Sequence, residues 1–270
     1  MPERGEARGW YLYGVIDTQP RPDAFSDLDH VRCIQFKDMA ALVSNVSLDE
    51  FDESQLPARL NDPKWLERKL WAHQQVLDRV LGIATVVPMK FATVFKSELR
   101  LLAALDAHYE GILELFKKLK GKHEYALKVF LKRALLEAEV EQTHPRAQVL
   151  KKQCAGQPQG TAYLLRKQLD KLLGEETEKR LNQRLQTIYE RLGDVADERR
   201  LNLVTAEQVT KPQAEMVLNA ALLAAVGRRD EVLTTVSALE NEFSSGGFTF
   251  QVVGPFPPYN FSQLVVQSNE

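Results

Sequence analysis

Residues 248–261 read FTFQVVGPFPPYNF and combine a strand pattern with a proline-rich arm. In the first six residues, large apolar side chains alternate with their neighbours, which is the two-residue period of a strand with one buried face. Gly254 interrupts this strand, because glycine adopts backbone conformations that a Cβ disfavours. Three prolines follow and remove N–H donors, so we expect the hydrogen-bonded ladder to end there. What remains is a stiff, extended arm that carries Phe256, Tyr259 and Phe261.

The arm is suited to tight packing, because its prolines have already restricted the chain and little conformational entropy is lost on docking. The surface that it packs against belongs either to this chain or to another protein. Large aromatic side chains are usually well buried. Packing within the chain, for example in a cleft between two domains, is therefore favoured over a purely exposed docking site.

The composition excludes several classes of protein. With 270 residues, 44% hydrophobic and 27% charged, the chain is typical of a globular protein of two modest domains or one large one. A formal net charge of −2 gives no general attraction to nucleic acid or to anionic membranes. The charged start MPERGEARG lacks the apolar core of a secretory signal, and no apolar run is long enough to insert in a membrane. Two cysteines without metal-type spacing, Cys33 and Cys154, fit a reducing cytoplasm.

The first half of the chain predicts an α+β domain. Aromatic and β-branched residues indicate strands at 10–16, 31–36 and 41–46, and a buried strand at 83–87. The segment 47–62 is acidic and irregular. A second helix of this half is expected from the N-cap Ser97 to about residue 119, with an apolar side formed by Leu102, Tyr109, Leu113 and Phe116.

The first helix of this half is expected to begin at Pro63. Asp62 is a good N-cap, proline is common at the first helical position, and Gly82 ends the pattern. The apolar face at helical spacing consists of Leu66, Leu70, His73, Leu77 and Val80.

The second half predicts the order β, helical hairpin, β, β, α, β. Strands are expected at 125–131 and 200–205, an amphipathic helix at 230–243, and a closing strand at 248. The apolar run at 216–226 is expected to be a fully buried strand, with a helix as the less favoured alternative. Two long apolar stripes, with a restart at Pro145, predict an antiparallel hairpin at about 133–196. This is the order of a split βαβ, ferredoxin-like fold with its first helix lengthened into a hairpin. We therefore predict an α+β protein of two domains, 1–121 and 122–270, the second including the arm.

No catalytic constellation is evident in the sequence. The five histidines are scattered, and His73 on an apolar helix face is better explained as a packed side chain than as a ligand or base. Cys33 and Cys154 are explained in the same way as small apolar side chains. Glycine-rich phosphate-binding loops are lacking, because the run at 244–247 follows a helix and precedes a strand. We expect no enzyme, no metal and no cofactor.

Seven short segments, spread over nearly the whole chain, form an ordered set: WYLYGVI at Trp10, VVPMKFATVF at Val86, HEYALKVFL at His123, GTAYLLRK at Gly160, LNLV at Leu201, NAALLA at Asn219 and GPFPPYNF at Gly254. In this order they resemble the GvpF/GvpL family of gas vesicle proteins, and the terminal GPxPPYxF element is the most specific. Two residues depart from the usual pattern of that family: Phe256 stands where Trp is usual, and Ala92 where Gly is usual.

The resemblance implies a minor, non-catalytic gas vesicle component that acts in nucleation or assembly. It implies a modified ferredoxin-like fold for the N-terminal domain and an α+β C-terminal domain with a helical projection. The implied partners are the small hydrophobic shell protein GvpA and other accessory Gvp proteins, in the cytoplasm at the vesicle shell. Candidate partner-binding residues are Lys90, Phe91, Phe256, Pro257, Pro258, Tyr259 and Phe261.

Two other hypotheses remain open at this point. The first is a small-molecule-binding or enzymatic α+β protein with an inter-domain site that uses Lys90, His73 and Tyr259; it requires a deep pocket with converging polar groups and perturbed pKa values. The second is a scaffold that recruits a coiled-coil partner through the hairpin between Leu135 and Leu192.

Overall fold

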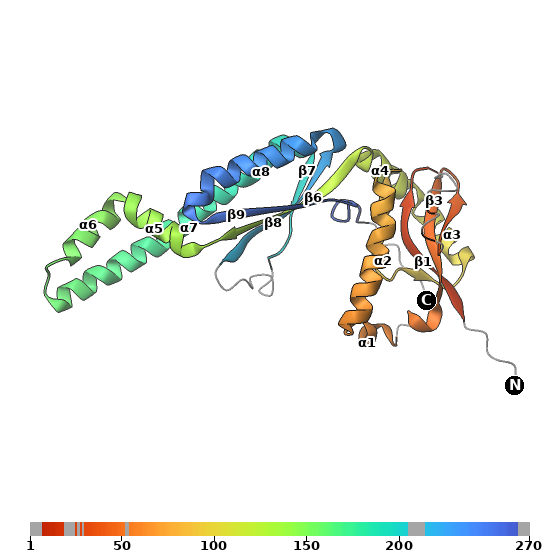
Figure 1. Ribbon diagram of the computed structural model, residues 1–270, viewed down its shortest axis with the longest axis horizontal. Coiled ribbons are helices and arrows are strands. Elements are labelled where there is room, and N and C mark those ends of the chain that lie inside the picture. The colour runs from red at the N-terminus through yellow and green to blue at the C-terminus, as the bar shows by residue number, and fades with distance from the viewer. Residues whose placement is uncertain are drawn as a thin grey trace. The chain divides into compact units, whose positions relative to one another are not determined.

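The computed structural model describes residues 7–18, 25, 28, 30–51, 54–204 and 214–263, and it is a mixed α+β structure with two sheets (Figure 1). Contacts divide the chain into two compact units: Met1–Glu124 together with Pro255–Glu270, and Tyr125–Gly254. The first unit differs from the predicted domain 1–121 because it includes the arm, which the sequence analysis assigned to the second domain. That each unit is an independently folding domain stays a prediction.

The sheet of the first unit is built around β1 (Arg8–Ile16). Its strand order is β2-β3-β1-β4, with β5 (Val94–Phe95) also pairing with β1. The strands β2 (Val31–Phe36) and β3 (Met39–Ser47) form an antiparallel pair, and β3 pairs with β1. The three predicted N-terminal strands are therefore confirmed. The fourth, β4 (Val86–Pro88), begins later than predicted, and Ile83 is exposed.

Helix α2 (Pro63–Leu81) begins and ends where the sequence predicts. The Asp62 carboxylate accepts hydrogen bonds from the backbone N–H groups of Lys64 (3.0 Å) and Trp65 (3.4 Å), which caps the first turn. Gly82 is the C-cap. A short helix, α1 (Leu56–Leu60), and the 3₁₀ turn η1 (Leu48–Glu50) occupy part of the segment that was expected to be irregular.

The predicted helix after Ser97 is broken into α3 (Glu98–Ala107) and α4 (Tyr109–Leu119). The Ser97 hydroxyl accepts from the Arg100 N–H at 3.3 Å, so the predicted N-cap is confirmed. The buried side chains keep one helical spacing across the break at His108, but they lie beside the predicted face: of the predicted residues only Phe116 is buried, and Leu102, Tyr109 and Leu113 are half-buried. The side chains that are buried instead are Leu101, Leu105, Ile112 and Leu119.

The sheet of the second unit has the strand order β7-β8-β6-β9. Its strands are β6 (Lys122–Leu131), β7 (Glu198–Leu201), β8 (Glu215–Ala225) and β9 (Phe248–Phe256). The buried strand expected at 216–226 is thus confirmed; the one expected at 200–205 ends at Leu201, and residues 205–213 lie outside the described part. Helices α7 (Gln159–Val195) and α8 (Arg229–Phe243) pack with this sheet around one apolar core.

The predicted helical hairpin is present in the second unit. Helix α5 (Arg133–Thr143) is followed by a restart at Pro145, which begins α6 (Pro145–Cys154), and α7 runs back alongside both (Figure 1). A small apolar cluster that includes Leu150 of α6 and Leu169 of α7 packs these two helices together. Glu139 of α5 pairs with two residues of α7, Arg180 at 3.1 Å and Arg184 at 2.5 Å, and these ion pairs link the two helices.

In the described part of the chain, no helix is both long and apolar enough to cross a membrane. The same residues contain no group of three or more His, Cys, Asp or Glu side chains that could hold a metal ion.

Candidate functional site

The C-terminal arm packs within the chain, in the unit that contains α2. Pro257, Pro258 and Phe261 are buried, and only 1% of Phe261 is exposed. Asn260 donates two hydrogen bonds to the buried Glu124 carboxylate, from its backbone N–H at 2.8 Å and from its side-chain amide at 2.5 Å. These contacts agree with the expectation that the arm packs against its own chain.

Gly254 lies inside β9 instead of ending it. Its φ of +138° is a conformation that a residue with a Cβ rarely adopts, as the sequence analysis predicted. The strand nevertheless continues to Phe256, so the predicted end of the strand at the first proline is wrong.

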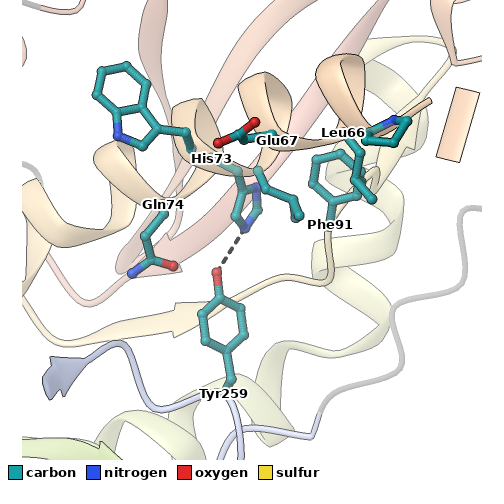
Figure 2. A pocket seen from close by; sticks show the side chains of 9 residues that line it. Leu66, Glu67, His73, Gln74, Phe91 and Tyr259 are labelled. Carbon is teal, nitrogen blue, oxygen red and sulfur yellow. Dashed lines mark hydrogen bonds between the residues drawn. The ribbon is translucent and has the colours of Figure 1, made fainter. Parts of the chain in front are cut away.

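Tyr259 of the arm is linked to the sheet through His73 of α2. The Tyr259 hydroxyl lies 2.9 Å from His73 Nε2, and the Tyr11 hydroxyl of β1 lies 2.8 Å from His73 Nδ1 (Figure 2 draws the first of these bonds). Tyr11 also accepts a hydrogen bond from the Ala92 N–H at 3.1 Å. Three segments that are far apart in sequence therefore meet at one imidazole.

The hydrogen bonds around Tyr11 favour one proton arrangement of His73. Since Ala92 N–H is a donor, the described partner that can accept the Tyr11 hydroxyl proton is His73 Nδ1. In that arrangement a neutral imidazole carries its proton on Nε2, from which it can donate to the Tyr259 oxygen. A backbone hydrogen bond with Met89 also acts on this imidazole and opposes the effect of burial on its pKa.

Burial explains the electrostatics of this network. Desolvation disfavours the charged imidazole and lowers the pKa of His73 to about 4. The same cause raises the pKa of Tyr11 and of Tyr259 well above the ordinary value of a phenol. All three groups are therefore neutral at physiological pH, and the network positions the arm without carrying charge.

An apolar groove of about 810 Å³ lies between α2 and Tyr259. Figure 2 shows Phe91 and Gln74 on either side of the His73–Tyr259 hydrogen bond, with Leu66 and Glu67 along α2. The residues that line the groove are Pro63, Leu66, Glu67, Leu70, Trp71, His73, Gln74, Phe91 and Tyr259.

The outer wall of the groove consists of large apolar side chains that remain in contact with solvent. Trp71 is 63% exposed and Leu70 is 42% exposed. The sequence analysis placed Leu70 on the apolar face of the helix, but the structure leaves it exposed. Helix α1 and Glu50 of η1 contact other residues of this half of α2, among them the buried Trp65. Exposed large apolar residues that gather around a hollow are typical of binding surfaces.

The structure brings together only some of the predicted partner-binding residues. Phe91 and Tyr259 line the groove, whereas Lys90 is exposed and Phe256 is half-buried, and neither lines it. Pro257, Pro258 and Phe261 are buried and do not line the groove either. The sequence analysis missed Trp71. Its position directly after Leu70 was a signal, because it indicates an apolar face of α2 that extends beyond the side chains buried in the core.

The groove has few features of a catalytic site. His73 and Tyr259 of the enzymatic hypothesis do meet, but both imidazole nitrogens are hydrogen-bonded to tyrosine hydroxyls, and Lys90 does not line the groove. His73 is thus a packed histidine, as predicted. The arrangement offers apolar contact area with a few polar groups.

Comparisons with known proteins find relatives along almost the whole chain. The family model described as gas vesicle synthesis protein GvpL/GvpF matches residues 9–263. Gas vesicle protein L of Haloferax mediterranei is 27% identical over 207 residues, which are 74% of this chain and 63% of that relative. Gas vesicle protein F of Microcystis aeruginosa is 26% identical over 263 residues, which are 95% of this chain and 99% of that relative.

A solved structure has the same fold. The crystal structure of the gas vesicle protein GvpF from Anabaena sp. PCC7120 superposes with a TM-score of 0.69 at 23% identity, covering 95% of this chain and 98% of that one. Since the family model spans almost every described residue of both units, the chain belongs to the GvpL/GvpF family of gas vesicle synthesis proteins.

Proposed function

We propose that this protein is a minor, non-catalytic gas vesicle component that acts in nucleation and assembly by binding the shell protein GvpA and other accessory Gvp proteins. Membership of the GvpL/GvpF family supports a role connected with gas vesicles and a place at the vesicle shell. This family is one of structural and accessory proteins, not a known enzyme family.

The observation that carries the proposal is the exposed apolar groove beside α2. A shell protein that polymerises into a wall must expose apolar surface before it is assembled, and such surface aggregates unless a partner covers it. The groove presents Leu70, Trp71 and Phe91 in a surface that the arm completes through Tyr259. It can cover an apolar segment of a partner and keep it from aggregating.

The second unit has the strand and helix order of a split βαβ fold. Its strands follow the chain as β6, β7, β8 and β9 but lie in the order β7-β8-β6-β9. We infer a ferredoxin-like fold with the hairpin α5–α6–α7 inserted as its first helical layer. We also infer that the first unit is a modified ferredoxin-like domain.

Co-expression of tagged protein with GvpA tests the proposal. We expect GvpA to be retained on the tagged chain at low and at moderate salt, because apolar contacts are insensitive to screening. Floating vesicles that have been isolated and washed show whether the protein stays with the finished shell. Loss of GvpA at both salt concentrations, together with absence from washed vesicles, would refute the proposal.

A further inference from the structure

The groove has an acidic residue at its edge that is not neutralised within the described chain. Glu67 is exposed and is the only carboxylate that lines the groove. The nearby cation Lys69 pairs with Glu50 instead, with an Nζ–Oε1 distance of 2.8 Å. No ion pair or hydrogen bond of the Glu67 side chain is found among the described residues, so its charge is available to a partner.

Glu67 and Trp71 form a paired feature on one face of α2. They are four residues apart, which places them one above the other on a helix. A carboxylate beside an exposed indole is a favourable setting for a lysine or arginine, which gains charge attraction from the first and a cation–π contact from the second. The groove therefore combines an apolar lining with one exposed carboxylate beside an exposed indole.

The shape of the wall matches a helix better than an extended peptide. Residues spaced by four form two parallel ridges on α2, one through Pro63, Glu67 and Trp71 and the other through Leu66, Leu70 and Gln74. Helices pack by laying such ridges into the grooves of a partner helix. The backbone N–H and C=O groups in the middle of α2 are used within the helix, so an extended peptide would find no ladder to join.

The length of the wall sets the length of the partner segment. From Pro63 to Gln74, α2 rises by about 16 Å, which is roughly three turns. A partner helix that follows it would contribute apolar side chains at positions i, i+3, i+4 and i+7.

We propose that the groove binds an amphipathic α-helix of a partner protein, three turns long, with one lysine or arginine at the edge of its apolar face that contacts Glu67 and Trp71. Resting on the proposed function, this helix belongs to another gas vesicle protein. The chain's own end, LVVQSNE at 264–270, has an acidic residue and no lysine or arginine, and therefore does not complement Glu67.

A charge-swap experiment on the full chain tests this proposal. The probe is a fluorescently labelled, stapled helix of about 16 residues, long enough to present the three turns, with leucines at i, i+3, i+4 and i+7 and one lysine at the edge of that face. A second probe has glutamate in place of the lysine. Fluorescence anisotropy gives the Kd of each probe for the wild type, Glu67→Lys and Trp71→Ala.

We expect Glu67→Lys to weaken binding of the lysine probe about tenfold, because it places a lysine opposite a lysine. The same substitution should strengthen binding of the glutamate probe, because it replaces a pair of like charges by a pair of opposite charges. Trp71→Ala should weaken both helices about tenfold, since buried tryptophans dominate interface energies. The matched control Glu114→Lys makes the same charge change at an exposed position of α4, outside the groove, and should leave both Kd values unchanged.

An unchanged ratio of the two Kd values in Glu67→Lys would overturn the proposal. So would probe binding that appears only after residues 264–270 are removed, which would make the chain's own end the occupant. A dimer in the absence of probe that Trp71→Ala dissociates would also overturn it, in favour of a second copy of the chain.

The test is separate from that of the proposed function. If the charge swap fails while wild type and Trp71→Ala both retain GvpA, the proposed function stands and the groove inference is wrong. If the charge swap succeeds while no gas vesicle protein is retained, the groove binds helices but the proposed function is wrong.

Discussion

Helix α2 has an apolar face along its whole length, but its two halves have different surroundings. In the second half, Val76, Leu77 and Val80 are fully buried in the core of the first unit. In the first half, Leu70 and Trp71 line an open groove and remain exposed. The comparison teaches that hydrophobic spacing predicts which side of a helix is apolar, and that it does not predict what covers that side. Trp65 of the first half is buried, so the proposed partner surface consists of the exposed side chains Leu70 and Trp71.

The largest expected effect separates the two halves by stability. Leu77→Ala should lower the free energy of unfolding by about 3 kcal/mol, because it leaves a cavity in the core. The same truncation in the groove, Leu70→Ala, should cost no more than about 0.5 kcal/mol. Urea unfolding followed by tryptophan fluorescence measures both, since Trp10, Trp65 and Trp71 all belong to the first unit. Equal losses of unfolding free energy in Leu77→Ala and Leu70→Ala would contradict the distinction between a core position and a groove position on α2.

His73 lies where the two halves meet, and its protonation should make the first unit sensitive to acid. Its pKa of about 4 when folded is below the value of about 6.5 in the unfolded chain. Between these pH values the unfolded state binds more protons, so this contribution to stability is present above pH 6.5 and is lost as the pH falls towards 4.

We therefore expect the wild type to lose roughly 2 kcal/mol more than His73→Gln between pH 7 and pH 5. Urea unfolding at the two pH values gives the difference. His30→Gln, which removes an exposed histidine of the same unit, controls for the loss of a histidine as such. Parallel pH dependence in the wild type and His73→Gln would contradict the buried, neutral assignment.

The sequence predicted elements better than it predicted surroundings. The cap of α2 at Asp62, the strands β1 to β3 and the restart at Pro145 were predictable because capping, alternation and proline act within a few residues. The break at His108 was not, since no proline or glycine marks it. The meeting of Tyr11, His73 and Tyr259 depends on packing across 186 residues of chain, which no local pattern specifies.

The third expected effect compares the two hydroxyls bound to His73. Tyr11→Phe should cost about 2 kcal/mol, because it leaves both His73 Nδ1 and the Ala92 N–H without a partner in a buried site. Tyr259→Phe should cost about 1 kcal/mol, since its half-buried hydroxyl has one described partner, His73. The same unfolding experiment ranks the two variants. A larger loss of stability for Tyr259→Phe than for Tyr11→Phe would contradict this ranking of the two hydroxyls.

The smallest expected effect concerns Ala92, the residue that departs from the family's usual glycine. Its φ of +63° is in the left-handed region, which is strained for any residue with a Cβ. Ala92→Gly relieves this strain, although glycine also increases the conformational entropy of the unfolded chain. The net effect should be a rise of up to about 1 kcal/mol in the free energy of unfolding. Ala103→Gly, in the exposed face of α3, should instead lower it by a similar amount. Destabilisation by Ala92→Gly would show that the strain is absent.

Two of the predicted binding residues, Phe91 and Tyr259, line the groove, and their role in binding remains a prediction. Both come from motif segments, which is why the sequence could point to them. Leu70 and Trp71 could not be found in this way, because a stripe on a helix looks the same whether the chain itself or a partner covers it.

The most direct measurement of the central claim is the amount of GvpA that co-purifies with each tagged variant. The double variant with Leu70→Ala and Trp71→Ala is compared with Leu99→Ala, which removes a 78% exposed leucine of the same unit outside the groove. Our account predicts that the double variant retains at least about tenfold less GvpA, with an unfolding free energy close to that of the wild type, while Leu99→Ala retains the wild-type amount. Full retention by the double variant would contradict the claim that the groove beside Leu70 and Trp71 of α2 is the binding surface.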